Sequence, residues 1–113
     1  MNRMVLSAVL QERGAVRYTP AGLPAIDCKL THASTATEDG QPRQVSLEIK
    51  ALAIGALARP LGTMALGSSA MFAGFLATTR NGRGLLFHIT ELTPVEFSPP
   101  IDSSPTLTRS AQI

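Results

Sequence analysis

The sequence has no tryptophan, one tyrosine and one cysteine, and these shortages narrow what the chain can do. A single cysteine, Cys28, permits neither an internal disulfide nor a CxxC metal site. The apolar stretch at the N-terminus is only about seven residues long, too short for a signal-peptide core and far short of a membrane span. The sequence therefore predicts a soluble cytoplasmic protein that makes no membrane contact.

Charge is also sparse. The net charge of +2 comes from ten basic residues, eight of them arginine, against eight acidic residues. Such a mild balance does not by itself indicate a nucleic-acid partner. The preference for arginine favours bidentate or stacking contacts, because a guanidinium makes both and an ammonium makes neither. The 113 residues suffice for one domain with one hydrophobic core.

Groups that could perform catalysis are few and scattered. Cys28 and His32 have the same strand parity, but four strand residues separate them by about 13 Å, too far for a nucleophile and its base. His88 has the opposite parity to its apolar neighbours and is expected at the surface. The glycine-rich loop RNGRG joins two strands, whereas a phosphate-binding P-loop must lead into a helix. We therefore expect no enzyme activity, no metal and no cofactor, and we expect Cys28 to be a small core residue.

Hydrophobic patterning indicates an all-β chain. Apolar and polar residues alternate in several segments, as in half-buried strands. The polar segments Thr19–Pro24 and Ser34–Pro42 are expected as loops. The alanine-rich segment Ala51–Gly67 is expected as a short helix or turn, broken near Pro60. The predicted strands are Met4–Leu10 (continued or bent at Gly14 before Arg17), Ala25–Thr31, Val45–Lys50, Ser69–Thr78 and Leu85–Phe97.

Five strands with a short helical connection between the third and fourth follow the order of the five-stranded Greek-key barrel called the OB-fold. We expect this domain to cover residues 1–97. Residues 98–113 are rich in proline and serine with few large apolar groups, so they are expected to form a disordered tail.

The last predicted hairpin carries an unusual tip. Asn81-Gly82 predicts a two-residue turn with positive φ at both positions, and Arg80 and Arg83 flank it. In an OB barrel this hairpin and the first loop border the groove that binds oligonucleotides. Arg17 begins that first loop, and Arg43 opens the third strand. Either these arginines are merely solvated charges, or they neutralise phosphates that pass through the groove.

Several motifs resemble a known family. MNRMVLSAVLQERGAVRYTPAGLPAIDCKL at residues 1–30 and GSSAMFAGFLATT at Gly67–Thr79 are similar to bacterial single-stranded-DNA-binding proteins. The general members of that superfamily usually carry stacking tryptophans and a long tail with an acidic tip, and this chain has neither. RQVSLEIKALAIG at Arg43–Gly55 and the NG hairpin followed by LLFHITEL are similar to its short, tailless branch, primosomal replication protein N.

This resemblance implies a homodimer that binds single-stranded DNA and assists the restart helicase and other primosome proteins. It also implies phosphate contacts by the four arginines. Ser46 falls where some members place a stacking tryptophan, so we expect weaker or rearranged DNA binding. Tyr18 is the best remaining stacking candidate, since Phe72, Phe75 and Phe87 are expected mostly in the core. The candidate nucleic-acid-binding set is Arg17, Tyr18, Arg43, Ser46, Lys50, Arg80 and Arg83.

Two other functions fit the same sequence. One is a general single-stranded-DNA-binding protein, which the missing acidic tip disfavours. The other is an OB-fold protein-interaction module with vestigial DNA affinity, which the missing tryptophan favours slightly.

Overall fold

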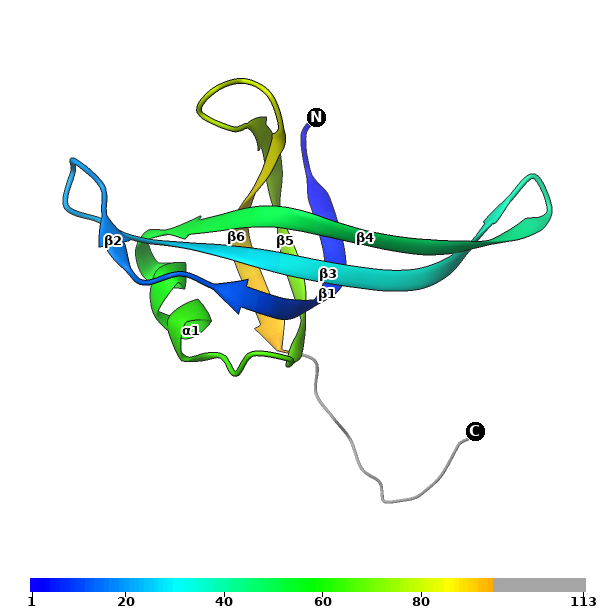
Figure 1. Ribbon diagram of the computed structural model, residues 1–113, viewed down its shortest axis with the longest axis horizontal. Helices are drawn as coiled ribbons and strands as arrows, with labels where there is room; N and C mark the ends of the chain where they lie inside the picture. The colour runs from blue at the N-terminus through cyan, green and yellow to red at the C-terminus, as the bar shows by residue number, and fades with distance from the viewer. Residues whose placement is uncertain (95–113) are drawn as a thin grey trace, which may run out of the picture.

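A computed structural model describes residues 1–94, which form a closed β-barrel with one short helix (Figure 1). The strands lie in the order β1-β5-β6-β4-β3-β2, and an additional β1–β3 pairing closes the barrel. All pairings are antiparallel except β4 with β6, which is parallel. The elements are β1 (Met4–Arg13), β2 (Arg17–Tyr18), β3 (Pro24–Glu38), β4 (Gln41–Ile54), a 3-10 turn (Gly55–Leu57), α1 (Ala58–Thr63), β5 (Ser69–Thr78) and β6 (Leu85–Pro94). This confirms the predicted OB-fold.

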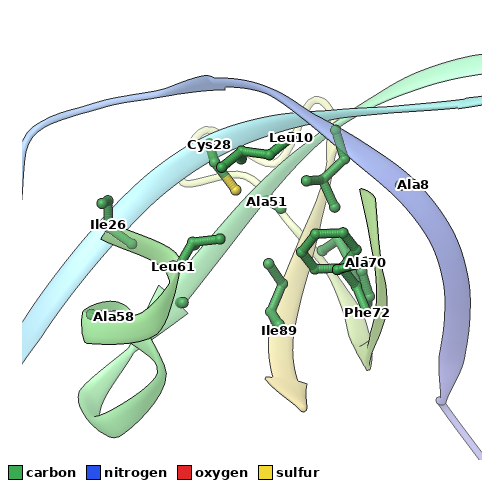
Figure 2. Close-up of a cluster of buried hydrophobic side chains, with 13 residues drawn as sticks. Ala8, Leu10, Ile26, Cys28, Ala51, Ala58, Leu61, Ala70, Phe72 and Ile89 are labelled. Carbon is green, nitrogen blue, oxygen red and sulfur yellow. The ribbon is translucent and has the colours of Figure 1, made fainter. Parts of the chain in front are cut away.

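The barrel core is built from the inward residues of each strand. Alternation places Ile26, Cys28 and Leu30 inside on β3, and Leu61 of α1 closes one end of the barrel (Figure 2). The largest fully buried side chains each contribute about 1.5–3 kcal/mol through removal from water. They are Phe72, Phe87, Leu10, Ile26, Leu30 and Leu61.

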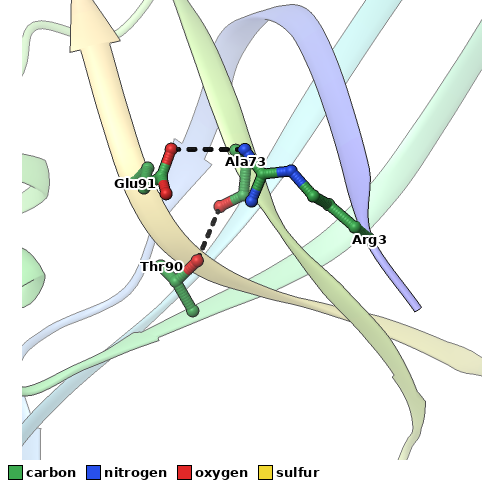
Figure 3. A network of polar contacts seen from close by, with 4 residues as sticks. All are labelled: Arg3, Ala73, Thr90 and Glu91. Atoms are coloured by element: carbon green, nitrogen blue, oxygen red, sulfur yellow. Dashed lines mark hydrogen bonds and ion pairs between the residues drawn. The ribbon is translucent and has the colours of Figure 1, made fainter. Parts of the chain in front are cut away.

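The N-terminal Asn2-Arg3 pair anchors the chain to neighbouring strands. The Asn2 amide donates to the Leu76 carbonyl at 2.7 Å and accepts from the Leu76 N–H at 3.0 Å, so its side chain extends the β1–β5 pairing by one step. Arg3 reaches across β5 to Glu91, with 3.4 Å between Nη2 and Oε1 (Figure 3). Both motif residues therefore have a structural role.

A β-bulge interrupts the β5–β6 pairing beside this ion pair. Ala73 pairs with Glu91 but Gly74 pairs with Ile89, so Thr90 is the extra residue. The Thr90 hydroxyl donates to the Ala73 carbonyl at 3.4 Å (Figure 3). A Cβ at Gly74 would lie 1.8 Å from the His88 carbonyl oxygen. Only glycine therefore permits this close approach of β5 to β6.

The predicted polar loop Ser34–Pro42 is wrong. Strands β3 and β4 continue through it with unbroken register to Glu38 and Gln41, and they form a long hairpin that extends beyond the barrel (Figure 1). Asp39 and Gly40 form its two-residue turn with φ of 51° and 75°. Positive φ at both positions matches the right-handed strand twist. The polar residues that indicated a loop belong instead to a hairpin whose two faces are both exposed.

Three further local predictions are also corrected. Ala51–Ile54 continues β4, because its alanines pack in the core beside β6. Pro60 lies inside α1 rather than breaking it, since the first turn of a helix does not need the missing N–H. The tip at Asn81-Gly82 is a longer connection: only Gly82 has positive φ there, and the Gly82 N–H donates to the Thr79 carbonyl at 2.8 Å.

The predicted domain end at Phe97 and the tail at residues 98–113 lie outside the described residues. Within residues 1–94, no helix has the length and apolar character needed to cross a bilayer.

Candidate nucleic-acid interface

A groove crosses the outer face of strands β3 and β4. One hollow of about 400 Å³ runs from the end of β1 over both strands to Leu86 of β6. A second hollow of about 610 Å³ lies between β4 and the β5–β6 connection. Lys50 lines both hollows, so they adjoin on this face. Together they mark a path from the β1–β3 side of the barrel to the tip at residues 79–84.

Two cations of the candidate set line the second hollow of this groove. Lys50 projects from β4, and Arg83 lines the same hollow from the β5–β6 connection. Neither side chain is in an ion pair among residues 1–94. Arg80 stands on the same connection but does not line either hollow. The structure therefore separates the two tip arginines that the sequence treated as equivalent.

The tip holds its shape through side-chain hydrogen bonds. Asn81 Oδ1 accepts from the Thr79 hydroxyl at 2.7 Å and from the Arg83 backbone N–H at 3.0 Å. The Thr79 N–H donates to the Gly84 carbonyl at 2.9 Å and closes the connection. None of these bonds uses an arginine side chain, so the guanidinium of Arg83 is not needed to maintain the loop.

Arg17 is placed at the groove border but is already engaged. Its Nε donates to Asp27 Oδ2 at 2.9 Å and its Nη2 to Oδ1 at 3.2 Å, which is a bidentate pair. The hydrogen bond and the nearby negative charge of Asp27 raise the pKa of the Arg17 guanidinium. Both side chains remain about half exposed, at 53% and 55%. Asp27 also lines the first hollow.

Lys29 is a second engaged cation, on the outer face of β3. Its Nζ lies 3.7 Å from Glu12 Oε2 and 4.0 Å from Glu48 Oε1. Directly opposite it on β4 is Lys50. The register of β1, β3 and β4 brings these acidic groups around Lys29. The groove therefore contains carboxylates as well as cations.

Arg43 and Ser46 lie away from the groove, on the extended β3–β4 hairpin. Strand spacing puts Ser46 about 13 Å and Arg43 about 23 Å from Lys50 along β4. Arg43 pairs with Glu38, with 3.2 Å between Nε and Oε1. Arg43 lies seven residues from Lys50 along β4, an odd number, so it points to the opposite face of the strand. Ser46 lies four residues from Lys50 and shares the face of Lys50.

The aromatic residues divide between core and surface. Phe72 and Phe87 are fully buried, as predicted. Tyr18 on β2 is 69% exposed and lines neither hollow. Phe75, expected mainly as a core residue, is instead 39% exposed and stacks on His88 with ring centroids 4.8 Å apart. The opposite parity of His88 to Phe87 was the one sequence signal for this surface pair.

Cys28 and His32 have structural surroundings. Burial, together with the smaller effect of the nearby Asp27 charge, raises the pKa of the Cys28 thiol to about 12. His32 bridges β3 to β1, with Nδ1 2.6 Å from the Ser7 carbonyl and Nε2 2.8 Å from the Ser34 hydroxyl. In residues 1–94, no group of three or more histidine, cysteine or acidic residues is placed to hold a metal ion.

Comparisons with known proteins agree with this geometry. Residues 2–91 match a family described as "Another single-strand binding protein family". The chain is 49% identical over 80 residues to replication restart protein PriB of Bordetella pertussis, covering 71% of this chain and 75% of that one. It superposes on a solved structure of PriB from Ralstonia solanacearum with a TM-score of 0.78 and 41% identity, covering 85% of this chain and 99% of that one. The single-stranded DNA-binding protein of Thermus aquaticus shares the fold, with a TM-score of 0.67, 24% identity, and coverage of 85% of this chain and 51% of that one.

Proposed function

The chain belongs to the single-strand binding protein family, in the branch of replication restart protein PriB, and on that premise we propose that it binds single-stranded DNA as a nonenzymatic accessory protein of replication restart. The observation that carries this proposal is the groove in which Lys50 and Arg83 meet. Two cations that line one hollow over a face of an OB barrel suit a single strand of DNA whose phosphates follow the groove.

The proposed binding is electrostatic and has little specificity for DNA sequence. Phosphate contacts position a strand without identifying its bases. Tyr18 is the exposed aromatic nearest the predicted first-loop border, and a base could stack on it at the end of the path. Arg80 supplies long-range attraction beside the groove, while Ser46 and Arg43 lie on the hairpin for a strand that continues beyond the barrel.

A titration of fluorescent oligothymidine at two salt concentrations tests this proposal. Two phosphate contacts, at Lys50 and Arg83, predict a slope of about −1.4 in log affinity against log salt. Binding that is absent at low salt and micromolar protein would contradict the proposed function. A salt-independent affinity would contradict the groove as the binding surface.

We also propose that the chain forms a symmetric dimer through β1. Residues Met4–Ala8 pair with β5 on one edge, whereas the β1–β3 pairing begins only at Val9, so the other edge of this segment has no strand partner among residues 1–94. Val5 there is 51% exposed. A second copy could add its own β1 to this edge. Sedimentation should give twice the 11.9 kDa chain mass at micromolar concentration, and a monomer would refute this assembly.

A partner in replication restart is the remaining part of the proposal. We propose that the chain bridges the restart helicase to loading factors in the bacterial cytoplasm. An interaction module with little DNA affinity is the second candidate, because Val5, Met71 and Phe75 leave an apolar area exposed on the β1–β5 face. A pull-down with purified restart helicase, with and without oligothymidine, separates the two. Capture that needs DNA supports the first, and capture unaffected by DNA supports the second.

A further inference from the structure

Arg17, at the groove border, binds the carboxylate of Asp27 in the same geometry in which it would bind a nucleic-acid phosphate. A guanidinium binds carboxylate and phosphate in the same forked way, through two parallel N–H donors. In this structure the fork of Arg17 is filled by both oxygens of Asp27, at 2.9 and 3.2 Å. Asp27 stands on the outer face of β3 and lines the groove itself. Its carboxylate therefore occupies the position of a bound anion.

This pair is not required to hold the loop that carries Arg17. The Gly14 N–H donates to the Asp27 backbone carbonyl at 2.8 Å, which fixes the start of the loop. The Thr19 N–H donates to the Leu23 carbonyl at 2.8 Å, and β2 pairs with β3 at Arg17 and Tyr18. Half-exposed ion pairs add little stability to a fold. The pairing consequently has no evident structural need.

We propose that Asp27 limits and tunes affinity for single-stranded DNA by acting as an internal competitor for Arg17. This inference rests on the proposed function. An incoming phosphate must displace Asp27 from the guanidinium before Arg17 can contribute. Glu12 and Glu48 act in the same sense at Lys29. Lys50 and Arg83, which line the groove outside any ion pair among residues 1–94, then remain immediately available, and binding stays weak and readily reversible.

A double-mutant cycle measures the competition directly. The four proteins are the full-length chain, Asp27→Asn, Arg17→Ala and the double variant, each titrated with fluorescent oligothymidine. Asp27→Asn should raise affinity about two- to fivefold, the range that an exposed ion pair supplies. Loss of Arg17 should cost about two- to fivefold more in the Asp27→Asn background than in the parent. Simple repulsion between Asp27 and phosphate cancels in this comparison. The parent and Arg17→Ala both have Asp27, whereas Asp27→Asn and the double variant both lack it.

Asp39→Asn is the control for net charge. It removes the same negative charge at the hairpin turn, where Asn also tolerates the φ of 51°. Twelve strand residues place it about 40 Å from Asp27, well beyond the screening length of about 10 Å in 0.1 M salt. Its affinity should match the parent. Circular dichroism and melting temperature check that each variant is folded, and Asp27→Ser replaces Asp27→Asn if the latter is not.

The outcomes separate this inference from the proposed function. Parent and Asp27→Asn proteins with equal affinity would overturn the competitor role while leaving DNA binding intact. If Asp27→Asn raises the affinity for oligothymidine equally with and without Arg17, the competitor role is also overturned, because Asp27 would then act only as a repelling charge. If neither protein binds oligothymidine at low salt, the proposed function fails and the inference fails with it.

Discussion

Arg83 and Arg80 should behave differently when each is replaced by alanine, although they stand three residues apart. Arg83 lines the hollow that it shares with Lys50, and Arg80 does not. If a phosphate occupies that hollow, Arg83→Ala removes one contact and flattens the salt slope by about 0.7. Arg80→Ala should leave the slope unchanged. The sequence alone did not distinguish Arg80 from Arg83 as candidate phosphate contacts.

The size of the effect can be worked out for an ordinary experiment. A rise in salt from about 0.05 to about 0.2 M is fourfold. Because Arg83→Ala has one phosphate contact fewer, the affinity advantage of the parent over this variant should shrink by about 2.6-fold across that rise. Fluorescence anisotropy with labelled oligothymidine resolves that change. Because Asn81 and Thr79 hold the tip without the arginine side chains, circular dichroism should be the same for all three proteins.

Two results would refute this reasoning. Equal changes of slope in Arg80→Ala and Arg83→Ala would mean that the hollow does not select between them. A steep parent slope that neither variant alters would show that the strand follows another path. Lys50→Ala serves as the positive comparison, since Lys50 lines both parts of the groove.

Three other predictions concern stability, stacking and the buried thiol. Gly74→Ala should destabilise the fold by about 3 kcal/mol, lowering the melting temperature by roughly 12–24 °C, because its Cβ would lie 1.8 Å from a backbone oxygen; Gly62→Ala, whose Cβ would meet Ile26 at an ordinary 3.8 Å, should be neutral or stabilising. Tyr18→Ala should weaken oligothymidine binding by about 1–3 kcal/mol if a base stacks there, with Tyr18→Phe retaining affinity, and equal binding by all three proteins would exclude the stack. The pKa of Cys28 is raised from 9.0 to about 12 in the fold, so its contribution to stability is complete below pH 9 and is lost as pH rises from 9 toward 12; urea unfolding across that window should show a decline that a Cys28→Ala variant lacks, and native protein should resist iodoacetamide until it is unfolded.

The barrel could be predicted from local pattern, but the identity of its turns could not. Alternation in β3 gave the correct inward residues, since Ile26, Cys28 and Leu30 are all buried. Asp39-Gly40 and Asn81-Gly82 carry similar turn chemistry, yet only the former is the two-residue turn. The difference lies in which residues pair across each turn, and cross-strand pairing depends on the whole sheet rather than on the dipeptide.

The site was predicted less completely, because charge pairing is a three-dimensional property. Arg17 and Asp27 are ten residues apart and belong to different strands, so no local spacing indicated their bidentate contact. Lys50 and Arg83 meet only because the barrel brings the β5–β6 connection over β4. Composition identified the arginines as unusual, but only the fold distinguished those that are engaged from those that are available.

The parallel pairing of β4 with β6 constrains when the protein can fold during synthesis. Ala51–Ala53 find their partners Phe87–Ile89 only about thirty-five residues later in the chain, whereas the β3–β4 hairpin can zip locally from its turn. Until β6 has emerged from the ribosome, the edge of β4 stays open beside an incomplete core. A nascent chain stalled before residue 85 would therefore present an unpaired edge and unburied apolar side chains, the state in which a β-protein is most prone to aggregate.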